Sequence, residues 1–285
     1  MPELPEVECV RRGLEKADLS SKVIRSVWRS DLDLRTGAFW RDERLHLLAR
    51  ARTGAFERRG KFLLWRLTGA DGQDLAAVIH LGMTGRVTVC GPKAEPIAHT
   101  HLIVSLRGGP ELHYADARRF GGVHVDTLER LEQVGPLATL GPEPLERGFT
   151  AEVLEARGGR SKRAIREVLL DQRVVAGLGN IYVSEALFRA GLPPLARACE
   201  FRSSAWQRLA QAIRDVLRQG IRNGGTTLRD YRGTEGERGR NQDALKVYGR
   251  GGQACSACGT TLRAYEHAGR SGVLCPRCQP ARRRR

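Results

Sequence analysis

The spacing of apolar residues predicts a change of secondary structure near residue 135. Residues 5–17 place Val7, Val10 and Leu14 at the i, i+3, i+7 spacing of an amphipathic helix, with charged residues between them. Short β-type runs follow at close intervals, many of them separated by glycine and proline turns, at 22–28, 62–67, 75–81, 86–90, 101–106, 112–114 and 123–126. Short strands spaced in this way predict an antiparallel sandwich or barrel.

Two Gly-Pro steps, Gly135-Pro136 and Gly141-Pro142, interrupt regular structure and predict a linker between two domains. We expect an N-terminal domain at 1–132, the linker at 133–149 and a C-terminal domain at 150–285. Beyond the linker the apolar spacing is helical, and helices are expected at 150–156, 161–172, 181–190 and 203–219. The basic, glycine-rich residues 220–244 predict a mobile loop, and 262–274 predict a β-hairpin with Arg270 at its tip. The expected fold class is α+β.

The net positive charge of the chain limits the kinds of partner that it is expected to bind. The 285 residues include 48 Lys and Arg against 32 Asp and Glu, a formal net charge of +16, and the isoelectric point is near 10.3. Residues 238–285 hold eleven Lys and Arg and two Asp and Glu, a net +9. An anionic membrane surface or an acidic protein would also match a basic chain, but the clustering favours nucleic acid. The last four residues, Arg282 to Arg285, fit a phosphate-seeking arm.

The amount and distribution of hydrophobic residues exclude three classes of protein: disordered, membrane-spanning and secreted. They make up 41% of the chain, which is enough for a core in each half and excludes wholesale disorder. No apolar run approaches the roughly 20 residues of a membrane span, and the first residues lack the pattern of a secretory signal. We therefore expect a soluble, cytoplasmic protein.

Four of the seven cysteines form a metal-binding pattern. Cys255-x2-Cys258 is followed, after sixteen residues, by Cys275-x2-Cys278. Two thiolates at each of two turns complete a tetrahedral cage for one Zn²⁺, with an iron–sulfur or redox site as the alternative. A closed set of four thiolates leaves no open coordination position, so a structural role is expected. His267 is a fifth candidate ligand, and an exposed turn position is the alternative for it.

Pro2 offers an unusual nucleophile, because removal of Met1 would leave a secondary amine at the chain terminus. An α-amino group titrates at about 7.7–8.0, so part of it is unprotonated and nucleophilic at neutral pH. Such an amine condenses with an aldehyde to give a cationic iminium, which is an electron sink for eliminations. Glu3 and Glu6 place carboxylates beside it for proton transfer. Met-Pro starts are also common without such chemistry, so this pattern alone leaves both interpretations open.

Motifs along the whole chain resemble those of bacterial formamidopyrimidine-DNA glycosylases. In chain order they are Met1-Pro2-Glu3-Leu4-Pro5-Glu6-Val7-Glu8, His80-Leu81-Gly82-Met83-Thr84-Gly85, Asp116-Ala117-Arg118-Arg119-Phe120-Gly121, Leu140-Gly141-Pro142-Glu143-Pro144-Leu145, Gly177-Leu178-Gly179-Asn180-Ile181-Tyr182, Gly224-Gly225-Thr226-Thr227-Leu228, Val247-Tyr248-Gly249-Arg250 and the four-cysteine pattern. The N-terminal octapeptide together with the cysteine finger is highly specific to this family. The resemblance therefore favours Pro2 as a nucleophile.

The resemblance implies an N-terminal β-sandwich flanked by helices and a helical domain with a helix–two-turns–helix motif and a zinc-finger hairpin at 246–280. It implies DNA in the cleft between the domains, one structural Zn²⁺ and a monomeric, nucleoid-associated enzyme. The expected activity is excision of oxidised purines, 8-oxoguanine and formamidopyrimidines, from duplex DNA, followed by β- and δ-elimination at the abasic site.

The resemblance also assigns roles to single residues. For catalysis it implies Pro2 as nucleophile, Glu3 as acid/base, and Lys61 and Arg270 as proton donors that also contact phosphate. For the lesion pocket it implies Glu6, Glu185 and Thr226. For DNA binding it implies Met83, Arg118 and Phe120 in the space left by the flipped base, together with His99, Asn180 and Tyr248. The residues alone would also allow Met83 and Phe120 in the core and Lys61 in solvent.

Two departures from the family pattern bear on specificity. Ala117 stands where relatives usually carry proline, and Gly239-Arg240-Asn241-Gln242 replaces an aromatic-Gln pair. The shape of residues 224–240, which are expected to close over the flipped base, is therefore open. An endonuclease VIII-like enzyme for oxidised pyrimidines is the alternative, but such enzymes usually begin Pro-Glu-Gly-Pro, and Leu4 argues against it. A non-catalytic zinc-ribbon protein would explain the charge and the finger but makes no demand on Pro2.

Overall fold

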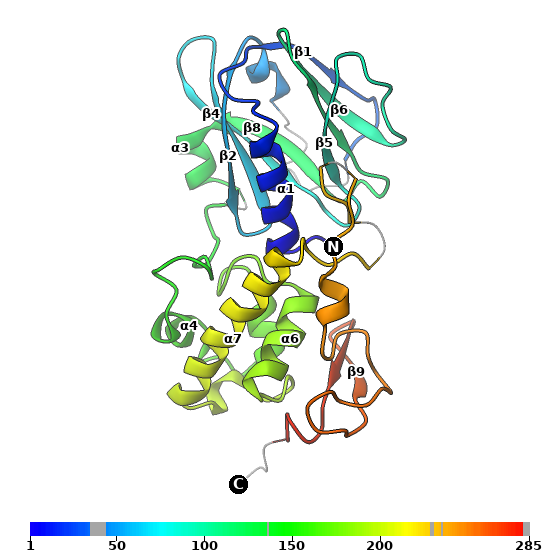
Figure 1. Ribbon diagram of the computed structural model, residues 1–285. Helices are drawn as coiled ribbons and strands as arrows, with labels where there is room; N and C mark the ends of the chain where they lie inside the picture. Colours follow the sequence, from blue (N-terminus) through cyan, green and yellow to red (C-terminus); the bar gives the residue numbers. More distant parts are fainter. Residues whose placement is uncertain (35–43, 136, 229–230, 235, 282–285) are drawn as a thin grey trace. The chain divides into compact units, whose positions relative to one another are not determined.

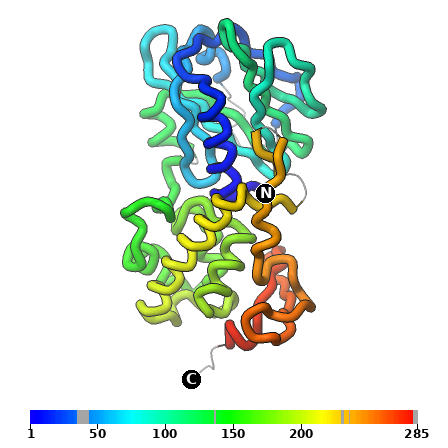
Figure 2. The backbone as a smooth tube through the Cα atoms, in the orientation of Figure 1, coloured from blue at the N-terminus to red at the C-terminus, as the bar shows by residue number. Residues whose placement is uncertain are grey.

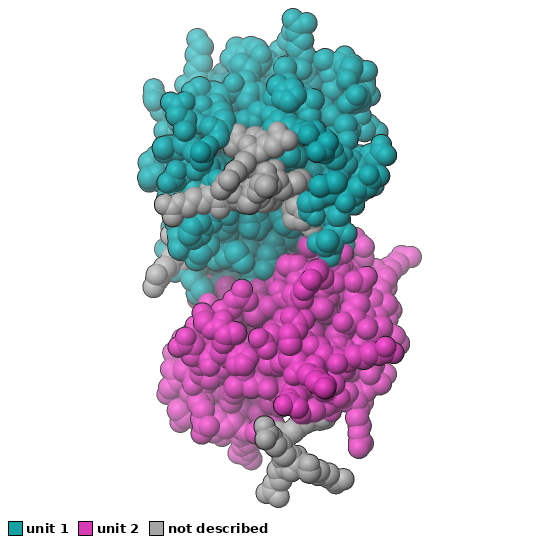
Figure 3. All heavy atoms as spheres, turned by 180° about the vertical axis from the view of Figure 1, so that it is seen from behind, with its two compact units in different colours: residues 1–139, 223–240 teal, residues 140–222, 241–285 magenta. Residues whose placement is uncertain are grey.

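The computed structural model describes residues 1–34, 44–135, 137–228, 231–234 and 236–281. The chain divides into two compact units (Figure 3). Unit 1 comprises Met1–Thr139 and Asn223–Arg240, and unit 2 comprises Leu140–Arg222 and Asn241–Arg285. The division at Thr139 falls within the range expected for the linker. The arm at Arg282–Arg285 lies outside the described residues.

Unit 1 contains two four-stranded antiparallel sheets that enclose one core (Figure 1). The first has the order β1 (Ile24–Arg29), β6 (Thr100–Leu106), β7 (Glu111–Ala115) and β5 (Arg86–Cys90). The second has the order β2 (Arg52–Arg59), β3 (Phe62–Thr68), β4 (Asp74–His80) and β8 (Gly122–Thr127). Apolar residues from both sheets form the core, which confirms the predicted sandwich.

Helices and short turns flank the sandwich. Helix α1 (Leu4–Lys16) buries Leu4, Val7, Val10 and Leu14 and packs on β2 and β3. Its apolar stripe is the one that the sequence predicts for 5–17. The 3₁₀ helix η1 (Leu45–Leu48) contacts β8, and α3 (Leu128–Gln133) begins where Thr127 accepts a hydrogen bond from the backbone N–H of Arg130.

The register of the second sheet places three turns at one end of the sandwich. Phe62, the first residue of β3, pairs with His80, the last residue of β4. His80 in turn pairs with Gly122, the first residue of β8. The turn before β3, the turn after β4 and the segment before β8 therefore lie side by side.

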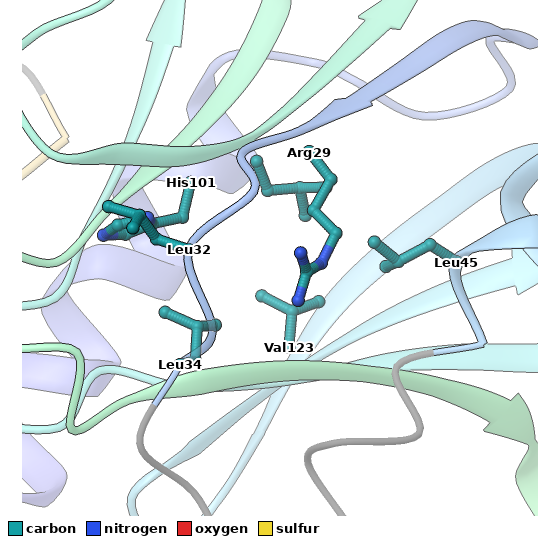
Figure 4. A pocket seen from close by; sticks show the side chains of 7 residues that line it. Arg29, Leu32, Leu34, Leu45, His101 and Val123 are labelled. Carbon is teal, nitrogen blue, oxygen red and sulfur yellow. The ribbon is translucent and has the colours of Figure 1, made fainter.

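A small cavity lies between strands of the two sheets (Figure 4). Its lining is mostly apolar and consists of Arg29, Leu32, Leu34, Leu45, His101, Leu102 and Val123. Its volume is about 10 Å³, which is the space of about one water molecule. The cavity is therefore a packing void and cannot hold a nucleobase.

Unit 2 is built from four α-helices and a β-hairpin among its described residues. The helices are α4 (Ala151–Gly158), α5 (Ile165–Leu170), α6 (Asn180–Ala190) and α7 (Ser203–Arg222), with the 3₁₀ turns η2 (Ala198–Glu200) and η3 (Asn241–Ala244). Helix α7 packs on α4 and α6, and the hairpin of β9 (Arg263–His267) and β10 (Arg270–Leu274) packs on α6 through β10. These elements confirm the predicted α+β class.

Two expectations about this half of the chain need correction. The helix predicted at 161–172 is limited to Ile165–Leu170, because Ala164 forms a β-bridge with Arg197 that occupies the preceding backbone. Residues 223–240, predicted as part of the C-terminal domain, belong to unit 1. Figure 2 shows the backbone returning after α7 to the N-terminal end of the chain. Tyr231 is buried there in the core of unit 1.

No helix among the described residues has the length and apolar character needed to cross a membrane.

Candidate nucleic-acid interface and zinc site

The first six residues form the start of helix α1. Met1 is 53% exposed, whereas Pro2 is buried, so the chain turns inward directly after its first residue. Glu3 is the N-cap, and Glu6 in the first turn accepts a hydrogen bond from the Glu3 N–H through Oε2 at 2.9 Å. Reciprocal capping of this kind satisfies backbone donors that have no partner within the helix. The two carboxylates beside Pro2 are thus held by the helix start itself.

Glu6 also binds the segment that returns from α7. Its Oε1 accepts a hydrogen bond from the Thr226 N–H at 2.7 Å, and the Tyr231 hydroxyl donates to the Glu6 carbonyl oxygen at 3.4 Å. Gly225 has φ +86°, and a Cβ there would lie 2.9 Å from the Tyr231 ring and 3.1 Å from Glu6 Cγ. The structure therefore brings Glu6 and Thr226 together, as the lesion-pocket prediction requires, and glycine makes this approach possible.

Four predicted DNA-contact residues of unit 1 lie on adjacent loops. Met83 is half-buried in the turn between β4 and β5, while Arg118 and Phe120 are exposed in the segment before β8. The Arg118 guanidinium lies over the Phe120 ring, 4.6 Å from its centroid. His99 is exposed before β6 and has φ +66°, a conformation uncommon outside glycine. Neither Met83 nor Phe120 belongs to the core.

Lys61 lies at the turn between β2 and β3, at the same end of the sandwich. Its side chain is 7% exposed, so it is not the solvated lysine that the sequence alone allows. Burial, with a smaller contribution from the Lys61 charge, lowers the pKa of His80 to about 4. The His80 ring is therefore neutral at pH 7, and its Nδ1 accepts the Gly82 N–H at 3.3 Å.

In unit 2, a buried arginine connects two of the predicted phosphate contacts. Arg166 of α5 is 1% exposed and donates to Asn180 Oδ1, to the Arg270 carbonyl oxygen at 3.2 Å and to the Ser271 carbonyl oxygen at 2.7 Å. Asn180 Nδ2 also donates to Ser271 O at 3.1 Å. The start of α6 and the tip of the hairpin are thus held against one side chain. Arg270 itself is exposed at the first position of β10, as predicted.

Glu185, a predicted lesion-pocket residue, binds backbone N–H groups of unit 2. Its Oε1 accepts the N–H groups of Val247 and Tyr248, and its Oε2 accepts the N–H of Lys246, each at 2.9 Å. Glu185 is 6% exposed, and this carboxylate fixes the backbone that presents Tyr248. Glu185 lies in unit 2 and Glu6 in unit 1.

The four predicted cysteines gather at the end of unit 2. Their sulfur atoms all lie within 4.8 Å of one another, with Cys255 and Cys278 Sγ 4.0 Å apart and Cys258 and Cys275 Sγ 3.4 Å apart. A tetrahedron with Zn–S bonds of about 2.3 Å has S···S edges of about 3.8 Å, so this set fits one Zn²⁺. His267 is not a fifth ligand in this arrangement, since its Nε2 lies 3.3 Å from the Glu167 carboxylate.

Two residues that organise these loops were not singled out from the sequence. Arg166 lies in α5 among the buried residues Ile165, Val168 and Leu169, and a charged residue at a buried position of a helix is a signal that the sequence carries. Asp116 opens a recognised motif, but its local sequence gives no sign that it is fully buried.

Comparisons with protein-family models agree with this geometry along the chain. The model of the formamidopyrimidine-DNA glycosylase N-terminal domain matches residues 1–123. The model of the formamidopyrimidine-DNA glycosylase H2TH domain matches residues 140–232, and a zinc finger found in FPG and IleRS matches 252–281.

Full-length relatives and solved structures give the same assignment. The formamidopyrimidine-DNA glycosylase of Desulfitobacterium hafniense (strain DSM 10664 / DCB-2) is 44% identical over 98% of this chain and all of its own length. The crystal structure of the MutM (Fpg) protein from Thermus thermophilus is 38% identical, with a TM-score of 0.85 over 98% of both chains. The Lactococcus lactis Fpg in complex with an abasic site containing DNA is 32% identical, with a TM-score of 0.86 over 98% of this chain and 100% of that one. With the finger's cysteines in place and relatives matched from end to end, this chain belongs to the formamidopyrimidine-DNA glycosylase family.

Proposed function

We propose that this DNA glycosylase of base excision repair excises oxidised purines, 8-oxoguanine and formamidopyrimidines, and then acts as an abasic-site lyase through Pro2. The observation that carries the proposal is the chain start, where Pro2 follows an exposed Met1 and precedes two buried carboxylates of α1. Removal of Met1 turns the Pro2 amide nitrogen into a secondary amine at this point.

The proposed chemistry begins with attack of the Pro2 nitrogen on the anomeric carbon of the damaged nucleotide. The C–N bond to the base breaks, the base leaves with a proton, and opening of the sugar gives an iminium between Pro2 and C1′. Glu3 moves the proton at the sugar ring oxygen. The iminium accepts the electron pair left by proton loss at C2′, so the 3′-phosphate departs by β-elimination, and δ-elimination then releases the 5′-phosphate. The product is a one-nucleotide gap with phosphate ends.

A base within a duplex is out of reach of Pro2, so the nucleotide must leave the helix at a cost of a few kcal/mol. We assign Met83, Arg118 and Phe120 to the vacated space. The stacked Arg118–Phe120 pair supports this assignment, because it presents a hydrogen-bond donor for the widowed cytosine beside an aromatic wedge. Glu6, Thr226 and Glu185 are proposed to line or support the lesion pocket.

The flanking phosphates are assigned to Lys61 and His99 in unit 1 and to Asn180, Tyr248 and Arg270 in unit 2. Asn180 begins α6, where the positive end of the helix dipole adds affinity for an anion. Lys61 and Arg270 are also the proposed proton donors of the elimination steps. Because the substrate is chromosomal DNA, the protein is expected in the cytoplasm with the nucleoid.

Borohydride reduction on a duplex with one abasic site tests the nucleophile. The reaction traps an iminium as a stable amine, so the native protein should form a covalent adduct with a mass that corresponds to loss of Met1. Pro2→Gly combined with Glu3→Gln should form none, and Glu15→Gln, an exposed position on the same helix, is the matched control. The glycine introduced at position 2 is itself a primary amine, so peptide mapping must locate any adduct that the double variant forms. An adduct on an amine other than that of residue 2 would overturn the proposal.

Lesion preference is tested by product analysis on duplexes that each carry one damaged base. Faster cleavage at oxidised purines supports the proposal. Faster cleavage at oxidised pyrimidines would assign the chain to an endonuclease VIII-like specificity instead.

A further inference from the structure

The carboxylate of Asp116 is fully buried beneath the loops that carry Met83 and the Arg118–Phe120 pair. Its Oδ2 accepts the Gly121 N–H at 2.7 Å, and its Oδ1 accepts the Arg118 N–H at 3.2 Å together with the hydroxyl of Thr84. Thr84 Oγ1 in turn accepts the Arg118 N–H at 3.1 Å. One carboxylate therefore joins the turn after β4 to the segment before β8.

The backbone of Asp116 extends this connection to a third loop. Its N–H donates to the His99 carbonyl oxygen at 3.0 Å, and His101 Nε2 lies 3.0 Å from its carbonyl oxygen. A residue such as His99, with positive φ, keeps that conformation only where its surroundings hold it. Asp116 is therefore bonded to each of the three segments of unit 1 that carry Met83, His99 and the Arg118–Phe120 pair.

The two central loops approach each other backbone to backbone. A Cβ at Gly82 would lie 2.4 Å from the Gly121 nitrogen, and a Cβ at Gly121 would lie 2.3 Å from the His80 carbonyl oxygen. The Tyr114 hydroxyl lies beneath, 3.2 Å from that carbonyl oxygen and 3.4 Å from Asp116 Oδ2. Burial and the Asp116 charge raise the pKa of Tyr114, so the phenol keeps its proton and donates it.

We infer that Asp116 is a positioning residue that holds Met83 and the Arg118–Phe120 pair as one preformed wedge for the space left by a flipped base, and that fixes the His99 loop beside this wedge. The inference rests on the proposed function. A preformed wedge enters DNA without first losing the conformational entropy of free loops.

Asp116→Asn tests this role with almost no change of volume. An amide offers one acceptor oxygen where the carboxylate offers two, so its NH₂ must face the N–H of either Arg118 or Gly121. Asp126→Asn is the matched control, because Asp126 is 3% exposed in β8 and its carboxylate is bonded, within the described part of the chain, to Arg44 and Arg130 and not to the three loops. Thr84→Val removes only the Thr84 hydroxyl, which links Asp116 to the turn that carries Met83. It replaces Asp116→Asn as the test variant if Asp116→Asn does not fold.

The measurement compares borohydride trapping on an abasic site in a duplex with the same site in a single strand. The single strand has no opposite base and no vacated stack, so it needs no wedge. We expect Asp116→Asn to lower the trapping rate on the duplex by about tenfold, as for loss of a buried hydrogen-bond acceptor. Its rate on the single strand should equal that of the native protein. Thr84→Val should show a smaller loss of the same kind, and Asp126→Asn none.

The opposite base gives a second readout. The preference for a site opposite cytosine over one opposite adenine should shrink in Asp116→Asn, and we expect the same change in Arg118→Ala, which removes the proposed hydrogen-bond donor for that cytosine. Equal loss on duplex and single strand, or no loss on either, would overturn the positioning role. A native protein that forms no adduct at all would instead overturn the proposed function, so the two failures are distinguishable.

Discussion

Glu6 accepts the backbone N–H of Thr226 at 2.7 Å, although 220 residues separate the two along the chain. The same carboxylate accepts the Glu3 N–H through its other oxygen. The chain start that carries Pro2 and the segment expected to close over a flipped base therefore share one side chain. Both bonds need an oxygen acceptor, and glutamine supplies only one.

Glu6→Gln should accordingly separate base recognition from elimination. One backbone N–H loses its acceptor, which costs about 1–3 kcal/mol and loosens the start of the 224–240 segment. We expect slower single-turnover excision of 8-oxoguanine, with trapping at a preformed abasic site retained, because no base remains to be recognised there. Glu15→Gln is the control. Equal loss on both substrates would mean that Glu6 acts on the Pro2 chemistry itself.

Arg166→Lys should weaken DNA binding, although Arg166 is buried and is not itself a proposed DNA contact. A single ammonium cannot replace a guanidinium that reaches Asn180, Arg270 and Ser271 together, so both proposed phosphate contacts lose their support. The logarithm of the DNA association constant decreases linearly with the logarithm of the salt concentration. This negative slope should become less steep by about 1–2, as for loss of one or two phosphate contacts. Arg202→Lys, an exposed position in the same unit, is the control. An unchanged slope would show that Asn180 and Arg270 are held by other means.

Removal of zinc should release the finger hairpin. Structural zinc supplies folding free energy to small domains of this kind, so a chelator should melt β9 and β10 and abolish duplex binding. Gel-shift titration before and after chelation measures the loss, and added Zn²⁺ should restore binding. Unchanged affinity in a zinc-free preparation, verified by metal analysis, would show that the hairpin is dispensable.

The sequence predicts those elements whose signal is local. The stripe of Val7, Val10 and Leu14 in α1 and the Cys-x2-Cys pairs are local patterns, and both appear as expected. Strand β2 is missed because Arg52–Arg59 is largely polar and carries an irregularity between Thr53 and Phe56, which hides the two-residue alternation.

Burial of single polar residues and the assignment of segments to a unit depend on tertiary contacts, which local sequence patterns do not reveal. The buried state of Asp116 and Arg166 depends on loops distant in sequence, and the place of 223–240 in unit 1 depends on long-range contacts such as that between Thr226 and Glu6. For the same reason the motif around Arg118 identifies the exposed residues but not the carboxylate that holds them.

The neutral His80 predicts a pH dependence of stability. Its pKa falls from an ordinary value of about 6.5 to about 4 in the folded protein. Between these values the unfolded chain binds a proton that the folded chain does not, so the free energy of unfolding decreases as the pH is lowered from 6.5 to 4. The contribution is absent above pH 6.5 and reaches its full size below pH 4. Its slope is at most about 1.4 kcal/mol per pH unit.

Comparison of His80→Gln with the native protein isolates this contribution, because the other titrating groups are common to both. Urea unfolding at pH 7.5, 5.5 and 4.5 should show a shallower decrease of stability for the variant. His46→Gln, at an exposed position of the same unit, should follow the native protein. The His80 ring resonance should itself titrate near pH 4 by NMR, and titration near 6.5 would contradict the argument. Protonation would also remove the Nδ1 acceptor for Gly82, so the turn that carries Met83 should loosen over the same pH range.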